Sequence, residues 1–241
     1  IIPAVIGGCT LLADGIITPP ISVSSAIEGL RILYPDIATV PIVMLIITGI
    51  FFLQQFGTDI VGKAFGPIMF IWFAMLGILG LSQLIMHPAI LNAINPTFAY
   101  QLLANHPGGF WILASVFLCT TGAEALYSDL GHCGKDNIRI SWTFVKITLL
   151  LNYFGQGAWL LTQDGTHLES NPFYTIMPDW FIIYGIGIAT IATIIASQAL
   201  ISGSFTLISE AVRLNIWPKV KINYPTETKG QLYVPSINWL L

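Results

Sequence analysis

Six stretches of this sequence, each about 20 residues or longer, contain almost no charged side chain, and no other feature constrains the fold as strongly. A helix needs about 20 mostly apolar residues to cross the hydrocarbon core of a bilayer. The stretches therefore predict an all-α fold, a polytopic bundle of transmembrane helices. They lie at Ile1–Leu30, Ile37–Phe56, Ala64–Ile85, Gly109–Leu130, Ile138–Leu161 and Trp180–Leu214, and a seventh begins near Tyr233.

The chain also carries too few charges for a surface that faces water. Charged residues make up 9% of its 241 residues, whereas soluble proteins use roughly a quarter. Hydrophobic residues reach 55%, and the mean hydropathy is +0.78. This composition excludes a soluble globular domain and a disordered chain. A net charge of −3 also provides no basic patch of the kind that binds nucleic acid.

Lysine and arginine are concentrated in alternate connections between the predicted spans. Cytoplasmic loops are enriched in these residues, so their distribution sets the orientation. Seven of the nine bases lie at 57–63, at 131–137 with Arg139 just beyond, and at 213–232. The other connections hold only Arg31. We expect the basic set to be cytoplasmic, in a multi-pass protein of the plasma (cell inner) membrane.

A carboxylate and two hydroxyls lie on one predicted helix face near the middle of the first span. Asp14, Thr18 and Ser22 are spaced at i, i+4 and i+8, which places them along one stripe. Pro19 and Pro20 lack an N–H, so two carbonyls one turn earlier lose their helical donors. Such hard oxygen ligands suit an alkali or alkaline-earth cation rather than zinc or copper. The alternative is a proline kink whose polar side chains only satisfy neighbouring helices.

A second polar cluster interrupts the fourth span. Thr121 and Gly122 break its helical pattern, and Glu124 follows directly. Secondary transporters bind ions at such broken helices near the midplane. A glutamate there can take up a proton or bind a cation, since burial and a nearby cation shift its pKa in opposite directions. The alternative is that Glu124 is a structural partner of a buried base such as Lys146.

A third cluster, in the sixth span, combines small and hydroxyl residues. Ala196, Ala199 and Gly203 favour close packing between helices, and this packing role is the preferred interpretation. A contribution of Ser202 or Thr206 to an ion site is the alternative.

The remaining polar residues give weaker signals. Glu28, a secondary site candidate, and Arg31 lie three residues apart at an external helix end, where we expect them to pair. Cys9, Cys119 and Cys133 have no zinc or redox spacing. No nucleotide loop, nucleophile elbow or metalloprotease motif is present, so we expect neither an enzyme nor a cofactor.

Several motifs resemble the Kup-type potassium uptake permeases, the KUP/HAK/KT family. They are Asp14–Leu30, Gln55–Phe73, Thr121–Gly134, Asn152–Ala158, Ser197–Ser204 and Gly230–Leu241. The resemblance runs in one order over essentially the whole chain. Its departures are minor: Ala13 stands where a glycine is usual, and Cys133 where an aromatic residue is common.

The resemblance implies a LeuT-like inverted-repeat fold of the amino acid–polyamine–organocation superfamily, with these spans as helices three to eight. It implies that Asp14, Thr18, Ser22 and Thr121 coordinate K⁺ and that Glu124 couples transport to protons. The sequence starts and stops inside apolar runs, so we expect 1–241 to be part of one membrane transport domain without a separate soluble domain. The family's first helix, which supplies further ion ligands, is expected to lie outside it.

The function implied by the resemblance is K⁺ import in symport with H⁺ by alternating access. The transported ions are K⁺ and H⁺, the surroundings are the lipid bilayer, and a homodimer of the full-length protein is a further expectation. Two other interpretations remain open: an amino-acid permease of the same superfamily, and an ion channel or non-transporting ion sensor. Proton-dependent uptake distinguishes a symporter from a channel, and a sensor shows no flux.

Overall fold

The computed structural model describes residues 2–56, 59–106, 108–119, 135–163, 168, 171–225 and 232–241. Two compact units divide the chain. Unit 1 comprises Ile1–Trp72 and Met177–Leu241, and unit 2 comprises Phe73–Ile176.

Helices form nearly all of the regular structure in the described residues. The α-helices are α1 (Ile2–Glu28), α2 (Leu30–Leu33), α3 (Thr39–Leu53), α4 (Asp59–Met86), α5 (Pro96–Asn105), α6 (Gly109–Cys119), α8 (Lys135–Leu160), α9 (Pro172–Thr175), α10 (Ile182–Arg213) and α11 (Pro235–Asn238). Two 3₁₀ helices, η1 (Gln54–Phe56) and η2 (Pro88–Ile94), extend or connect them. The predicted all-α class is confirmed.

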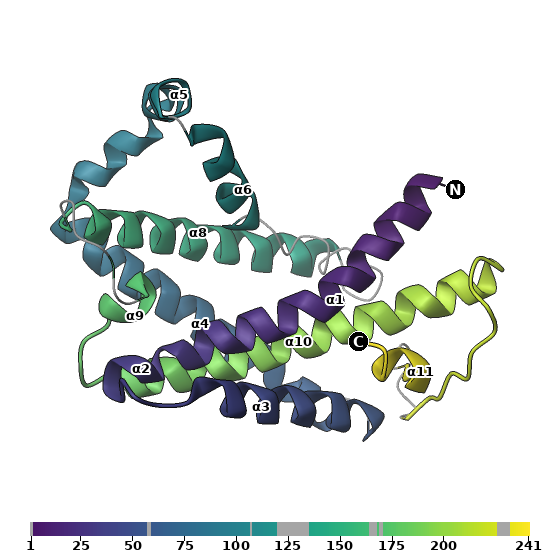
Figure 1. Ribbon diagram of the computed structural model, residues 1–241. Helices are drawn as coiled ribbons and strands as arrows, with labels where there is room; N and C mark the ends of the chain where they lie inside the picture. Colours follow the sequence, from purple (N-terminus) through teal and green to yellow (C-terminus); the bar gives the residue numbers. More distant parts are fainter. Residues whose placement is uncertain are drawn as a thin grey trace. The chain divides into compact units, whose positions relative to one another are not determined.

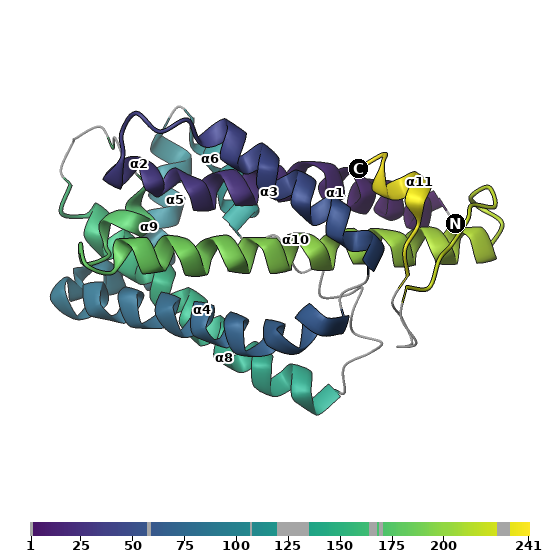
Figure 2. The same cartoon turned by 90° about the horizontal axis from the view of Figure 1, so that it is seen from below.

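In unit 1, α1 and α3 both pack against α10 (Figures 1 and 2). Their core is apolar: Val23, Ile50 and Phe205 are each at most 2% exposed. The short helix α11 joins this core, because the ring of Tyr233 just before it contacts the ring of Phe205 edge-on, with centroids 5.8 Å apart. Unit 1 therefore has an apolar core, in which close van der Waals packing of side chains holds the helices together.

In unit 2, glycines allow α4 and α8 to touch through their backbones. A Cβ atom on Gly80 would collide with the backbone of Leu151 and Asn152, and one on Gly155 would collide with the backbone of Gly80. A turn away, a Cβ on Gly77 would lie 3.0 Å from a methyl group of Thr148. Small residues permit such close approaches between membrane helices. The sequence-based prediction overlooked this crossing.

Four of the predicted spans are confirmed as helices long and apolar enough to cross a membrane. These are Val5–Leu33, Thr39–Phe56, Ala64–Met86 and Ile182–Arg213, counted over the described residues. The predicted span at 138–161 is a continuous helix, α8, but it is not among the four. Its charged and polar residues, such as Arg139, Lys146 and Asn152, lower its hydropathy. Of the predicted span at 109–130, only α6 lies in the described part.

Candidate cation site

The candidate site lies where α1 crosses α10 in unit 1. Gly15 is buried, and a Cβ atom placed on it would lie 3.0 Å from the Oγ of Ser204. Further toward the start of α1, Gly8 faces Leu207, which lies later on α10. The two helices therefore run antiparallel, side by side in both views (Figures 1 and 2). Gly15 brings α10 against α1 at the residue next to Asp14.

The polar stripe on α1 forms as its spacing predicts. The Thr18 hydroxyl donates a hydrogen bond to Oδ1 of Asp14, one helical turn earlier. Asp14, Thr18 and Ser22 are all half-buried, whereas Pro19 is fully buried. The helix continues through both prolines. Because proline has no N–H, two main-chain carbonyls beside Asp14 lack their usual helical donors.

No base on these helices compensates the charge of Asp14. Neither α1 nor α3 contains a lysine or arginine, and α10 has one only at its last residue, Arg213. Arg213 is occupied there by Glu210, with an N–O distance of 2.9 Å. The stripe is thus a carboxylate, hydroxyls and carbonyls on helices without a countercharge. Hard monovalent or divalent cations prefer such oxygen ligands.

The α10 residues predicted as secondary ligands lie away from α1. Ser202 and Thr206 are two positions from Ser204 on either side, so each points roughly 160° away from it around the axis. Both are half-buried, and the Thr206 hydroxyl donates to the Ser202 carbonyl at 3.1 Å. Ser204, fully buried and bonded to the Leu200 carbonyl at 3.1 Å, is the hydroxyl that meets α1. The sequence-based prediction chose Ser202 and Thr206 instead. Gly15, next to Asp14, was a signal that another helix could approach α1 closely at this point.

The predicted packing row on α10 is only partly buried. Gly203 is buried and Ala199 is half-buried, but Ala196 is exposed. Close packing on this helix therefore depends on Gly203 and Ser204 more than on Ala196.

Gln198 is a polar core residue that the sequence-based prediction did not single out. It is 5% exposed, and its Oε1 has no hydrogen-bond partner. At a rise of about 1.5 Å per residue, Gln198 lies about 9 Å before Ser204 on α10, and Ser22 about 10 Å beyond Gly15 on α1. Because α1 and α10 are antiparallel, these distances place the unpaired Oε1 of Gln198 at about the same level along the helix axes as Ser22. An unsatisfied buried acceptor of this kind is costly unless something binds it.

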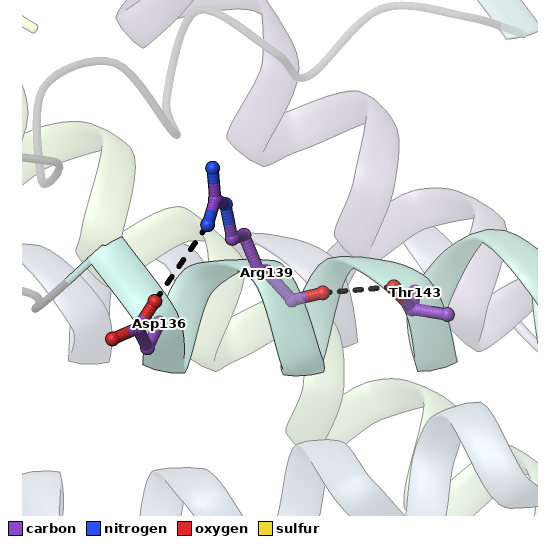
Figure 3. A network of polar contacts seen from close by, with 3 residues as sticks. All are labelled: Asp136, Arg139 and Thr143. Carbon is purple, nitrogen blue, oxygen red and sulfur yellow. Dashed lines mark hydrogen bonds and ion pairs between the residues drawn. The ribbon is translucent and has the colours of Figure 1, made fainter.

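The expected pairing of Glu28 with Arg31 is wrong. The Arg31 guanidinium instead donates to the Thr39 hydroxyl at 3.2 Å, which ties the α1–α3 connection to the start of α3. Glu28 is exposed. Among the described residues, the ion pairs are Glu210–Arg213 and the exposed pair Asp136–Arg139 at 3.8 Å. Arg139 also accepts, through its carbonyl, a hydrogen bond from Thr143 (Figure 3).

The second predicted cluster lies outside the described residues, which leave out 120–134 and with them Thr121 and Glu124. The base considered as a partner for Glu124 is described: Lys146 is exposed, with its Nζ 5.2 Å from the centre of the Trp142 ring. That cation–π contact gives the ammonium group a neighbour on its own helix. The role of Glu124 stays a prediction.

The described part of the chain shows no cluster of metal-ligating side chains. Its His, Cys, Asp and Glu side chains form no group of three that could hold a metal ion.

Comparison with known proteins identifies the family of the chain. Residues 1–241 match the family described as "K+ potassium transporter integral membrane domain". A Flavobacterium psychrophilum protein named "Probable potassium transport system protein Kup" is 66% identical over 247 residues, covering 100% of this chain and 38% of the relative. A Cytophaga hutchinsonii protein of the same name is 66% identical, covering 99% and 37%. "Probable potassium transport system protein Kup 2" of Lactococcus lactis subsp. cremoris is 56% identical, covering 100% and 37%. No solved structure matches the chain.

The fold and the family match define a multi-pass α-helical membrane protein. The chain belongs to the K⁺ potassium transporter family. It spans less than two-fifths of the length of these curated relatives. The relatives are named as transport proteins rather than enzymes, in agreement with the absence of catalytic motifs from the sequence.

Proposed function

We propose that the full-length protein takes up K⁺ together with H⁺ and that Asp14 is a K⁺ ligand. The observation that carries this proposal is the Asp14–Thr18 pair on helices that offer no compensating base. A carboxylate at the centre of a membrane helix costs roughly 2.5–3.5 kcal/mol on insertion scales. A bound cation removes that cost, which gives the site its affinity.

The ligand set follows from the stripe. Asp14 supplies the charge, and the hydroxyls of Thr18 and Ser22 supply oxygens along the same face. The resemblance adds Thr121 as a fourth ligand and Glu124 as the carboxyl group that takes up the proton. Import of two positive charges is favoured by about 2.3 kcal/mol per charge for each 100 mV of inside-negative potential.

The proposed mechanism is alternating access in a LeuT-like inverted repeat. In this arrangement α1, α3 and α4 are the third to fifth helices of the transport domain, and α6, α8 and α10 the sixth to eighth. Residues 1–241 are then a continuous part of one membrane domain. The buried contact between Gly15 and Ser204 supports a fixed position for the stripe, since it holds α1 against α10.

The test is ⁸⁶Rb⁺ or K⁺ uptake by the full-length protein in cells that lack their own K⁺ uptake systems. We expect Asp14→Asn to lower kcat/KM for K⁺ by at least about tenfold, the usual loss for a charged hydrogen-bonding partner. Asp36→Asn is the matched control, because Asp36 is exposed in the α1–α3 connection. Normal uptake by Asp14→Asn would exclude this residue as a ligand.

Proton coupling is tested separately with Glu124→Gln, which cannot ionise. We expect wild-type uptake to respond to an imposed proton gradient and uptake by Glu124→Gln to be the same with and without it. A wild-type protein whose uptake ignores the gradient would instead indicate a channel. Uptake of amino acids in place of K⁺ would favour a permease, and ion binding without flux would favour a sensor.

A further inference from the structure

A narrow apolar groove lies at one end of unit 1, between the start of α1 and the end of α10. It encloses about 170 Å³. Gly8, Cys9 and Leu12 line it from α1, and Leu207 and Ala211 line it from α10. The groove exists because Gly8 and Ala211 fill little space between the two helices.

The chain reversal after α10 closes one end of this groove. Asn215 has a positive φ of 54°, a conformation that asparagine tolerates better than most residues. The N–H of Ile216 donates to the Ala211 carbonyl at 2.9 Å, and the N–H of Asn215 donates to the Val212 carbonyl at 3.1 Å. These two bonds define a Schellman motif, which ends the helix and turns the chain back. Ile216 and Trp217 consequently line the groove.

Basic residues follow one another along the chain at the end of α10 and just after it. Between 207 and 221 the chain has three bases, Arg213, Lys219 and Lys221, and one acid, Glu210. Glu210 pairs with Arg213, and the two lysines are exposed. The distribution of bases along the sequence places this loop on the cytoplasmic side. With that orientation, we expect the groove to open where the acyl region of the inner leaflet meets its headgroups.

We propose that this groove binds an anionic phospholipid, with one acyl chain between α1 and α10 and the phosphate beside Lys219 and Lys221. The lining is apolar apart from Glu210, whose carboxylate pairs with Arg213, so it suits a hydrocarbon chain. Trp217, which is 37% exposed, suits the membrane interface. Clustered cytoplasmic bases attract anionic headgroups. Chain and headgroup together distinguish this occupant from a neutral lipid or a free anion.

The experiment is native mass spectrometry of the full-length protein with equimolar phosphatidylglycerol and phosphatidylcholine of identical acyl chains. We expect wild type to retain phosphatidylglycerol preferentially. Lys219→Gln together with Lys221→Gln should lower that preference about tenfold, since both headgroup contacts are lost. Arg139→Gln, which removes an exposed base in unit 2, should leave it unchanged.

Filling the groove tests the acyl-chain contact. Ala211→Phe should remove the retained lipid, whereas Ala196→Phe on the exposed face of the same helix should not. If Ala211→Phe does not elute as a folded protein, the lipid preference of the Lys219→Gln, Lys221→Gln double variant decides whether the proposal holds. Equal retention of the two lipids by wild type, or an unchanged preference in the lysine pair, overturns the proposal. A third outcome is that the protein binds no lipid and that Cys9 is protected from maleimide in delipidated protein. Another part of the protein then fills the groove, and this outcome also overturns the proposal.

Discussion

At the scale of single residues, the most informative contact is the hydrogen bond from the Thr18 hydroxyl to Asp14. This hydrogen bond lies within one helix, so it depends only on the i, i+4 spacing of the two residues. It also fixes the orientation of the Asp14 carboxylate. A hydroxyl that donates to a carboxylate keeps its own lone pairs available to a cation. Thr18 can therefore orient Asp14 and act as a ligand at the same time.

This dual role predicts different effects for two Thr18 substitutions. Thr18→Val keeps the shape but removes the hydroxyl, and we expect KM for K⁺ uptake to rise about two- to tenfold, in line with the loss of one hydrogen bond. Thr18→Ser keeps the hydroxyl and should stay close to wild type. Thr48→Val is the control, because its exposed hydroxyl on α3 bonds only to the Met44 carbonyl. An equal rise of KM in Thr18→Ser and Thr18→Val would point to packing instead.

At the scale of helices, glycines decide how closely neighbours approach. Gly15 admits Ser204 between α1 and α10, and Gly80 with Gly155 brings α4 and α8 into backbone contact. In a bilayer, lipid tails are as apolar as the helix surfaces, so association depends on such packing rather than on the hydrophobic effect. Of the two crossings, that of α4 with α8 is where an added methyl group should cost more, because it would meet backbone atoms rather than a hydroxyl.

Gly80→Ala should destabilise the full-length protein by about 1–3 kcal/mol, the typical cost of overpacking. The added Cβ would collide with backbone atoms, which cannot move aside as a flexible side chain could. Gly66→Ala is the matched control on the same helix, since a Cβ there meets nothing within 4 Å. The measurement is the unfolding transition in detergent. A midpoint that does not fall further in Gly80→Ala than in Gly66→Ala would contradict the close crossing.

At the scale of the whole molecule, the charges define two sides. Seven of the nine bases lie in alternate connections, and the membrane-spanning helices between them carry few charges. This distribution predicts which side of the membrane each connection faces, including the basic loop after α10. We expect Asp36 to lie outside the cell and Lys219 inside.

Cysteine labelling tests that orientation. In a background with Cys9, Cys119 and Cys133 replaced by serine, Asp36→Cys should react with an impermeant maleimide in intact cells. Lys219→Cys should react only after the membrane is permeabilised. Both positions are exposed, so access depends on the side of the membrane rather than on burial. The opposite pattern would invert the topology.

The sequence by itself determined that the surroundings are a lipid bilayer, that the fold is helical, and that Asp14 and Thr18 share one face of a helix. Apolar length identifies a spanning helix without any tertiary contact, and the spacing of Asp14 and Thr18 places them on one face because helix geometry is local. Local reasoning predicted a Glu28–Arg31 pair wrongly, because it could not see that the start of α3 brings Thr39 to Arg31.

Tertiary structure decided which residues of other helices approach the site. Ser202, Ser204 and Thr206 are all hydroxyl residues of α10, yet Ser204 is the one whose Oγ meets Gly15 of α1. The rotation of α10 about its axis decides this, and packing against α1 and α3 sets that rotation. The unsatisfied Oε1 of Gln198 and the groove lined by Gly8 also depend on how α10 packs against its neighbours. Sequence periodicity fixes which residues share a face of one helix; only contact between helices fixes what that face meets.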